Sequence, residues 1–293
     1  MDLPDSALPG LYQGADELSL RQQHRFLFAS RLRLALVVLA AVGGAFSIAV
    51  PSARLDLAAL VTVVALVGAV VTEMWLLVEK PEKGWYDGRA LAESAKTLAW
   101  RFAVGADPFP LHAAGSDAEA RLIDQLRELL RDAPDTAIVS TEAPAVSVAM
   151  RTLRAADLDL RRAAYFRQRI DDQTAWYRRK ARWNTDRARQ WRIGLLVLET
   201  LGVIAALVRA VGIVEIDLAG IVAALIGAGV AWLATKQHEN LGRAYAYAGN
   251  ELGLARARLE GVSDEQRWAQ EVADAEEAIS REHTMWRASR SSH

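Results

Sequence analysis

The sequence predicts an all-α integral membrane protein with four transmembrane helices, and three observations lead to this prediction. The chain has 293 residues, 52% of them hydrophobic, and most of these residues gather in four blocks. Each block is roughly 17 to 22 residues long, about the length that crosses 30 Å of hydrocarbon. The blocks form two pairs, each joined by a short connection. We therefore expect two helical hairpins in the membrane and long cytoplasmic helices that form a bundle.

The first pair of predicted spans covers residues 32–50 and 57–78. The first of these spans carries no charge except Arg33, and the second carries only Glu73. The connection at 51–56 starts with proline and is long enough only for a tight turn. This pair predicts a membrane hairpin.

The second pair covers residues 193–214 and 218–234 and contains more polar residues. Glu199 and Arg209 interrupt its first span, and its second span is near the lower length limit for a membrane helix. A buried hairpin in a soluble protein is the alternative. It is disfavoured because burying four such blocks would require a far larger soluble protein.

Basic residues mark the side of the membrane on which the polar segments lie, since they concentrate at cytoplasmic ends of spans. The short turns hold only Arg54 and, just inside the membrane, Arg209. Both termini and the segment 80–192 are therefore expected in the cytoplasm. The basic residues at the expected cytoplasmic ends are Arg21, Arg25, Arg31, Arg33, Lys80, Lys83, Arg89, Arg178, Arg179, Lys180, Arg182, Arg187, Arg189, Arg192, Lys236 and Arg243.

The polar segments are predicted to be mostly helical because they are rich in helix-forming residues and contain few breakers. The sequence favours three parts: a two-span unit at 1–105, a cytoplasmic connector at 106–145 and a second two-span unit at 146–293. The predicted polar helices are 85–104, continuing from the second span, 117–131, 146–192 running into the third span, 236–260 and 264–287.

No pattern for catalysis, metal binding or cofactor binding is present. The chain has no cysteine, its five histidines are far apart, and it lacks the glycine-rich loops that hold nucleotides. We therefore expect no enzyme activity, no metal and no cofactor. The basic residues at 176–192 are explained by membrane orientation, so anionic lipid is the expected partner and nucleic acid is not.

Ionisable residues inside a membrane are costly and usually face protein or water, which makes Glu73 and Glu199 the main candidates. Both lie at a similar depth from the cytoplasmic ends of their spans. Thr62 shares a helix face with Glu73, and Arg209 shares one with Glu199. In an oligomer these residues would line a cation pore. The alternative is a local ion pair of each glutamate with Arg33 or Arg192, or protonation, and the sequence leaves both open.

Small residues predict where helices pack closely. They form one stripe on the fourth span and a shorter one on the first, and both are interpreted as packing surfaces. The stripes consist of Gly220, Ala224, Gly227 and Ala231 on the fourth span, and of Ala40, Gly44 and Ser47 on the first.

The segments that flank the spans resemble one family in both halves of the chain. The first half contains LYQGADELSLRQQHRFLFASRLRL and WYDGRALAESAKTLAWRFAVGADPF. The second half contains YFRQRIDDQTAWYRRKARWN, KQHENLGRAYAYAGNEL and SREHTMWRA. These segments resemble the flanking patterns of SLATT proteins, the two-transmembrane effectors that associate with SMODS nucleotide synthases and SLOG sensors in bacteria. The resemblance covers nearly the whole chain, in tandem, except about 106–140.

The resemblance implies a membrane effector of a bacterial antiphage conflict system, in the plasma membrane, that forms pores when a nucleotide or other signal arrives. It also implies a separate sensor or nucleotide-signalling protein as partner. A homo-oligomer is expected on other grounds, because each polar helix alone buries little and can pack with helices of neighbouring subunits, although a bundle closed within one subunit is the alternative. The alternative is a membrane-anchored scaffold whose cytoplasmic helices recruit other proteins, since well over half of the chain lies outside the predicted spans.

Overall fold

The computed structural model describes residues 2–46, 49–50, 55–111, 115–133 and 138–288. This part of the chain is helical apart from loops and two strands of two residues each. Four helical runs are long and apolar enough to cross a membrane, so the predicted fold class is confirmed. Ser47 and residues 51–54 of the predicted turn lie outside the described residues.

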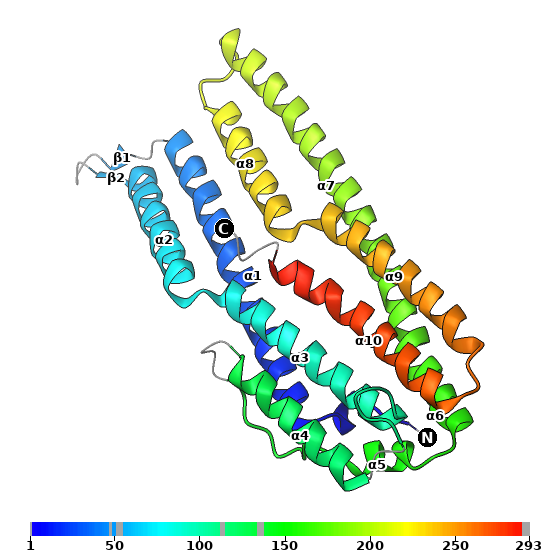
Figure 1. Cartoon of the computed structure of the whole chain (residues 1–293). Coiled ribbons are helices and arrows are strands. Elements are labelled where there is room, and N and C mark those ends of the chain that lie inside the picture. Colours follow the sequence, from blue (N-terminus) through cyan, green and yellow to red (C-terminus); the bar gives the residue numbers. More distant parts are fainter. Residues whose placement is uncertain (1, 47–48, 51–54, 112–114, 134–137, 289–293) are drawn as a thin grey trace. The chain divides into compact units, whose positions relative to one another are not determined.

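The helices follow one another along the chain, with longer connections only before and after α4 (Figure 1). In chain order the elements are η1 (Asp5–Ala7), α1 (Gly10–Ala45), β1 (Ala49–Val50), β2 (Leu55–Asp56), α2 (Leu57–Glu79), α3 (Pro81–Val104), α4 (Gly115–Arg131), α5 (Val148–Arg154), α6 (Leu158–Tyr165), the π-helical η2 (Phe166–Asp171), α7 (Asp172–Ala210), α8 (Leu218–Lys236), α9 (His238–Glu260) and α10 (Glu265–Ala288).

The chain divides into two compact units, and each draws on both halves of the sequence. Unit 1 consists of Met1–Gln23, Glu82–Ala181 and Arg243–His293, and holds most of the polar helices. Unit 2 consists of His24–Pro81 and Arg182–Gly242, and holds the apolar parts of α1, α2, α7 and α8.

The first span ends earlier than the sequence predicts. Helix α1 stops at Ala45, whereas the predicted span extends to Val50. The reason is a short antiparallel ladder in which Ala49 pairs with Asp56 and Val50 with Leu55. Val50 precedes a proline, which disfavours helical backbone at this residue.

The second helix of each pair of spans, α2 in the first pair and α8 in the second, begins and ends in the same way. At their starts, Asp56 and Asp217 accept backbone N–H groups of the first turn through their carboxylates. At their ends, Lys80 and Gln237 adopt left-handed backbone, with φ of 45° and 48°. The predicted continuation of the second span into the next helix is therefore wrong, because Lys80 separates α2 from α3.

In unit 2, α1 lies beside α2 and α7 beside α8 (Figure 1), and a glycine faces the neighbouring span in each pair. A Cβ atom on Gly43 of α1 would lie 2.5 Å from Thr62 Oγ1 of α2. A Cβ atom on Gly229 of α8 would lie 2.9 Å from the side chain of Leu195 on α7. A larger residue at Gly43 would also meet Ala58 O and push α1 away from α2, whereas one at Gly229 would require the Leu195 side chain to move.

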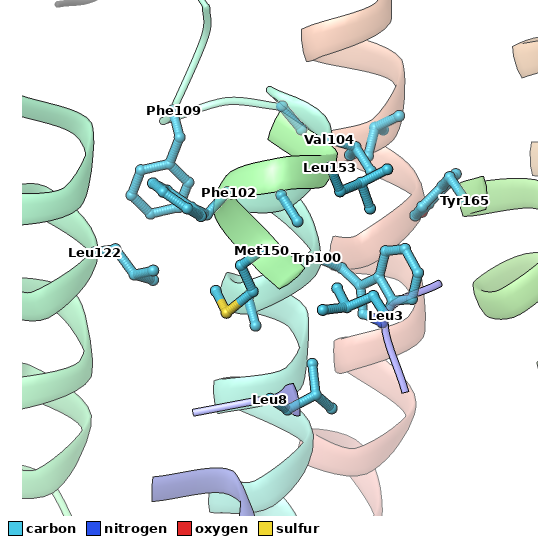
Figure 2. Close-up of a cluster of buried hydrophobic side chains, with 14 of the residues drawn as sticks. Leu3, Leu8, Trp100, Phe102, Val104, Phe109, Leu122, Met150, Leu153 and Tyr165 are labelled. Carbon is cyan, nitrogen blue, oxygen red and sulfur yellow. The ribbon is translucent and has the colours of Figure 1, made fainter. Parts of the chain in front are cut away.

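Unit 1 is held together by a core that joins the beginning, middle and end of the chain (Figure 2). Figure 2 shows Trp100 and Phe102 of α3, Leu122 of α4, and Met150 and Leu153 of α5 converging in this core. Trp268 of α10 completes it. The Trp268 side chain is fully buried, its ring meets that of Tyr165 edge to face at 5.9 Å, and its Nε1–H donates to Val104 O at 3.0 Å.

A buried polar network ties α3, α6, η2 and α10 of unit 1 together. Glu276 of α10 is fully buried, and both of its carboxylate oxygens accept hydrogen bonds from Arg169 of η2. The distances are 2.9 Å from Nε and 2.7 Å from Nη2. It also accepts hydrogen bonds from Tyr165 Oη at 3.0 Å and Thr97 Oγ1 of α3 at 2.9 Å. Burial opposes the charge of Arg169, but Glu276 outweighs it and holds the pKa of Arg169 above its usual value.

The single helix predicted over 146–192 is wrong, since the structure breaks at 155–157 and inserts the π-helical η2. Two buried arginines explain the break. Arg154 donates to the carbonyls of Phe102 and Phe109, at 2.8 and 2.7 Å, and Arg161 donates to Val104 O at 2.7 Å. These bonds satisfy free carbonyls near the end of α3 and beyond it, which a straight helix would not place within reach of both arginines.

Candidate functional site

The intramembrane carboxylate Glu73 has a partner within its own pair of helices. Glu73 on α2 forms an ion pair with Arg33 on α1. The local ion pair is one of the two alternatives that the sequence leaves open for this residue. A paired carboxylate is much less costly in a bilayer than an isolated one.

Glu199 lies in a different environment. Its side chain is exposed on α7, among exposed apolar residues such as Leu196 and Val203. No side chain of the described residues forms an ion pair or hydrogen bond with Glu199. Arg192, the partner proposed for it from the sequence, instead pairs with Glu239 of α9. The two glutamates therefore differ in their surroundings.

Thr62 and Arg209, the other two candidate pore residues, contact neighbours in the same pair of helices. Thr62 Oγ1 lies 3.0 Å from Ala58 O in its own helix and 3.4 Å from Ala40 O in α1. Arg209 forms an ion pair with Asp217, the residue that caps α8. These contacts place Thr62 between α1 and α2, and Arg209 at the turn between α7 and α8.

The residues of the small-residue stripes differ in their surroundings, and Ala40 of the stripe on the first span is buried, with its carbonyl oxygen 3.4 Å from Thr62 Oγ1 of α2. Gly44 and Gly227 are open, because a Cβ atom at either position would have no other atom within 4 Å. Gly220 faces the carboxylate of Asp217, and Ala224 and Ala231 are half-buried. Packing of Gly44 and Gly227 against other chains stays a prediction. Sequence reasoning missed Gly43, next to Gly44, and Gly229, two residues after Gly227. These two glycines face the neighbouring span.

Polar and aromatic residues gather where the apolar parts of the spans end. Trp232 of α8 lies between two cations of unit 2, with Arg31 at 4.9 Å and Lys236 at 5.3 Å from its ring centroid. Trp residues with nearby basic side chains are typical of the lipid headgroup level. We therefore expect this level near residue 232 on α8.

His238, next to this level, is a buried residue that sequence reasoning did not identify. It is 5% exposed, its Nδ1 lies 2.8 Å from Asn184 Oδ1, and its ring packs edge-on against Trp183 at 5.3 Å. Burial, with smaller contributions from Lys236 and Arg187, lowers the pKa of His238 below its ordinary 6.5. No histidine spacing in the sequence could have indicated this pairing.

Acidification should destabilise unit 2 through His238. Because the folded state holds the neutral ring, the unfolded chain binds a proton more readily, and stability falls as pH decreases below about 6.5. The contribution is fully present above that pH. Thermal unfolding of the full chain in detergent at several pH values would measure it. His238→Gln should remove this part of the pH dependence, while His24→Gln, at an exposed position, should retain it. Equal pH profiles for wild type and His238→Gln would contradict the assignment.

Among the residues that the structure describes, no group of three His, Cys, Asp or Glu side chains is arranged to hold a metal ion. The chemistry available in unit 2 is therefore that of paired and unpaired charges in an apolar setting. Such an arrangement can attract ions or lipid headgroups.

Two family models match the chain in tandem. Residues 9–162 match the SMODS and SLOG-associating 2TM effector domain 3. Residues 165–286 match the SMODS and SLOG-associating 2TM effector domain 1. No curated protein and no solved structure gave a significant match.

Proposed function

Because the chain belongs to the SMODS and SLOG-associating two-transmembrane effector family, SLATT, we propose that it is an oligomeric effector that opens a gated, cation-conducting pore. The family supports a multi-pass membrane effector of a conflict system. The pore is our extension of it. We place the protein in the bacterial plasma membrane, with both termini and the polar helices in the cytoplasm, and with antiviral defence as its role.

The exposed Glu199 is the observation that carries this proposal. It lies about seven residues from Arg192, or roughly 10 Å into the membrane at 1.5 Å per residue. A charged residue at the centre of a membrane helix costs about 2.5–3.5 kcal/mol on insertion scales, so such residues usually face protein or water. Several chains that turn this face of α7 toward a shared axis would remove Glu199 from lipid and surround a water-filled path with carboxylates.

The proposed partners follow from the same arrangement. The spans contact the bilayer, further copies of the chain cover α7, and a separate sensor or nucleotide-signalling protein supplies the gating signal. Nucleic acid binding and catalysis are not part of the proposal, because the basic residues are accounted for by membrane orientation and no catalytic arrangement supports a reaction.

Purified protein in liposomes should pass cations. Glu199→Gln should lower the ratio of cation permeability to anion permeability toward one. Glu73→Gln should act differently, because it removes the partner of Arg33 and so weakens the contact between α1 and α2. Reversal potentials across a planar bilayer under a salt gradient would measure both effects.

Glu215→Gln serves as a matched control, since Glu215 is exposed in the turn between α7 and α8. It should conduct like wild type. Liposomes that remain sealed under all gating conditions, or an unchanged ion preference in Glu199→Gln, would contradict the pore.

A scaffold is the second candidate, and the extensive core of unit 1 favours it. Such a core supports a stable surface on which other proteins can bind, with the spans serving only as an anchor. Replacing the spans by an unrelated four-helix anchor separates the two functions. A scaffold would continue to protect cells, whereas a pore would lose all activity.

A further inference from the structure

A cavity of about 460 Å³ lies in unit 2 where the polar ends of α7 and α8 meet the first turn of α9. Glu199 lies outside its lining, one helical turn beyond Leu195 on α7. The residues that line it are Ala188, Arg192, Leu195, Val230, Leu233, Ala234, Gln237, His238, Glu239 and Asn240.

The lining of this cavity changes from apolar to polar along the spans. Leu195, Val230 and Leu233 belong to the apolar parts of α7 and α8, while Arg192 and Glu239 lie beyond them. Trp232, with its two basic neighbours, marks the same level on α8. A cavity with one hydrocarbon-facing wall and one polar wall at headgroup depth matches the two parts of a phospholipid.

The charged lining consists of one cation and one anion. Arg192 and Glu239 form an ion pair with each other, and their side chains are 64% and 44% exposed. Exposed ion pairs contribute little to stability. Arg192 and Glu239 can therefore give up their mutual contact and bind a ligand instead with only a small loss of free energy. The first backbone hydrogen bond of α9 runs from Leu241 N to Gln237 O, so the amides before it add positive potential beside Arg192.

We propose that this cavity binds one phospholipid with a phosphoethanolamine headgroup. The phosphate lies against Arg192 and the first turn of α9, the ammonium group donates to the carboxylate of Glu239, and an acyl chain packs along Leu195 and Leu233. A primary ammonium has three N–H donors for Glu239, whereas the choline headgroup has none. A purely anionic headgroup would take Arg192 from Glu239 and supply no cation to the Glu239 carboxylate in return.

Native mass spectrometry of the detergent-solubilised full chain tests this site. The protein is mixed with equal amounts of phosphatidylethanolamine, phosphatidylcholine and phosphatidylglycerol that carry identical acyl chains. We expect one phosphatidylethanolamine to be retained about fivefold more than either other lipid. This is the ratio of binding constants that corresponds to the free energy of one exposed ion pair, about 1 kcal/mol. Arg192→Gln and Glu239→Gln should each abolish this preference.

Two matched controls lie outside the cavity lining. Arg189→Gln removes an exposed charge from the same helix, and Glu215→Gln removes one from the turn, and both should retain the preference. Equal retention of the three lipids would overturn the proposal. So would a loss in Arg189→Gln as large as that in Arg192→Gln, which would indicate a general basic surface. Soluble phosphoethanolamine that binds as tightly as the lipid would overturn the role of the apolar wall.

Discussion

Glu276→Ala is expected to destabilise unit 1 by about 3–5 kcal/mol, because it removes both hydrogen-bonded carboxylate oxygens from the buried charge of Arg169 and leaves it only the more distant carboxylate of Glu93, at 4.0 Å. Arg169 is 1% exposed, so water cannot replace the lost carboxylate. Tyr165 and Thr97 also lose the oxygens to which they donate. Chemical unfolding of the full chain in detergent, followed by tryptophan fluorescence, would measure the loss.

A double substitution shows whether Glu276→Ala acts by leaving a buried charge poorly paired or by removing side-chain packing. Arg169→Met with Glu276→Leu removes both charges of this pair and should cost less than Glu276→Ala alone, since no arginine stays buried without its hydrogen-bonded carboxylate and Glu93 keeps its ion pair with Arg89. Glu17→Ala breaks an exposed ion pair with Arg21 and should change the free energy of unfolding by at most about 1 kcal/mol. Equal effects of Glu276→Ala and the double substitution would contradict the explanation.

Trp268→Ala is expected to cost about 3–5 kcal/mol, the usual range for removing a large buried aromatic side chain. The substitution leaves a cavity beside Tyr165 and Phe166 and removes the hydrogen bond to Val104 O. The midpoint of chemical unfolding should therefore shift strongly. Hydrogen exchange in α3 and α10 should rise together, because Trp268 joins these helices.

Leu254→Ala on α9 is the control for this substitution, since Leu254 is 68% exposed. It should change the free energy of unfolding by about 0.5 kcal/mol or less. If Trp268→Ala behaved like Leu254→Ala, the core of unit 1 would not depend on α10.

The fold class could be predicted from the sequence because a bilayer imposes a length and a composition on each span. The helix breaks could not. Residues 155–157 contain neither glycine nor proline, and the break there depends on bonds from Arg154 and Arg161 to distant carbonyls. Local propensity carries no information on such long-range contacts. The division into two units from interleaved segments was likewise not visible in the order of the residues.

The candidate site was predictable in part. Low polarity around Glu73 and Glu199 identified them, and Arg33 was correctly named as one potential partner of Glu73. Their different surroundings depend on which side of each helix meets a neighbour, and a single apolar block does not reveal that. The same limit explains why Gly43, not Gly44, faces Thr62. Adjacent residues differ by about 100° around a helix.

The composite core of unit 1 has a consequence for stoichiometry. Its buried residues come from both family matches, with Trp100 and Met150 in the first and Leu259 and Trp268 in the second. A chain with only one of the two domains would need a second molecule to complete such a core. Completion of the core would then depend on the concentration of that molecule. Fusion fixes the two copies at one to one and permits them to diverge. Among the described residues, Glu199 of the second copy has no ion-pair partner while Glu73 of the first does. A ring of n chains therefore holds 2n pairs of spans but only n unpaired carboxylates at this depth.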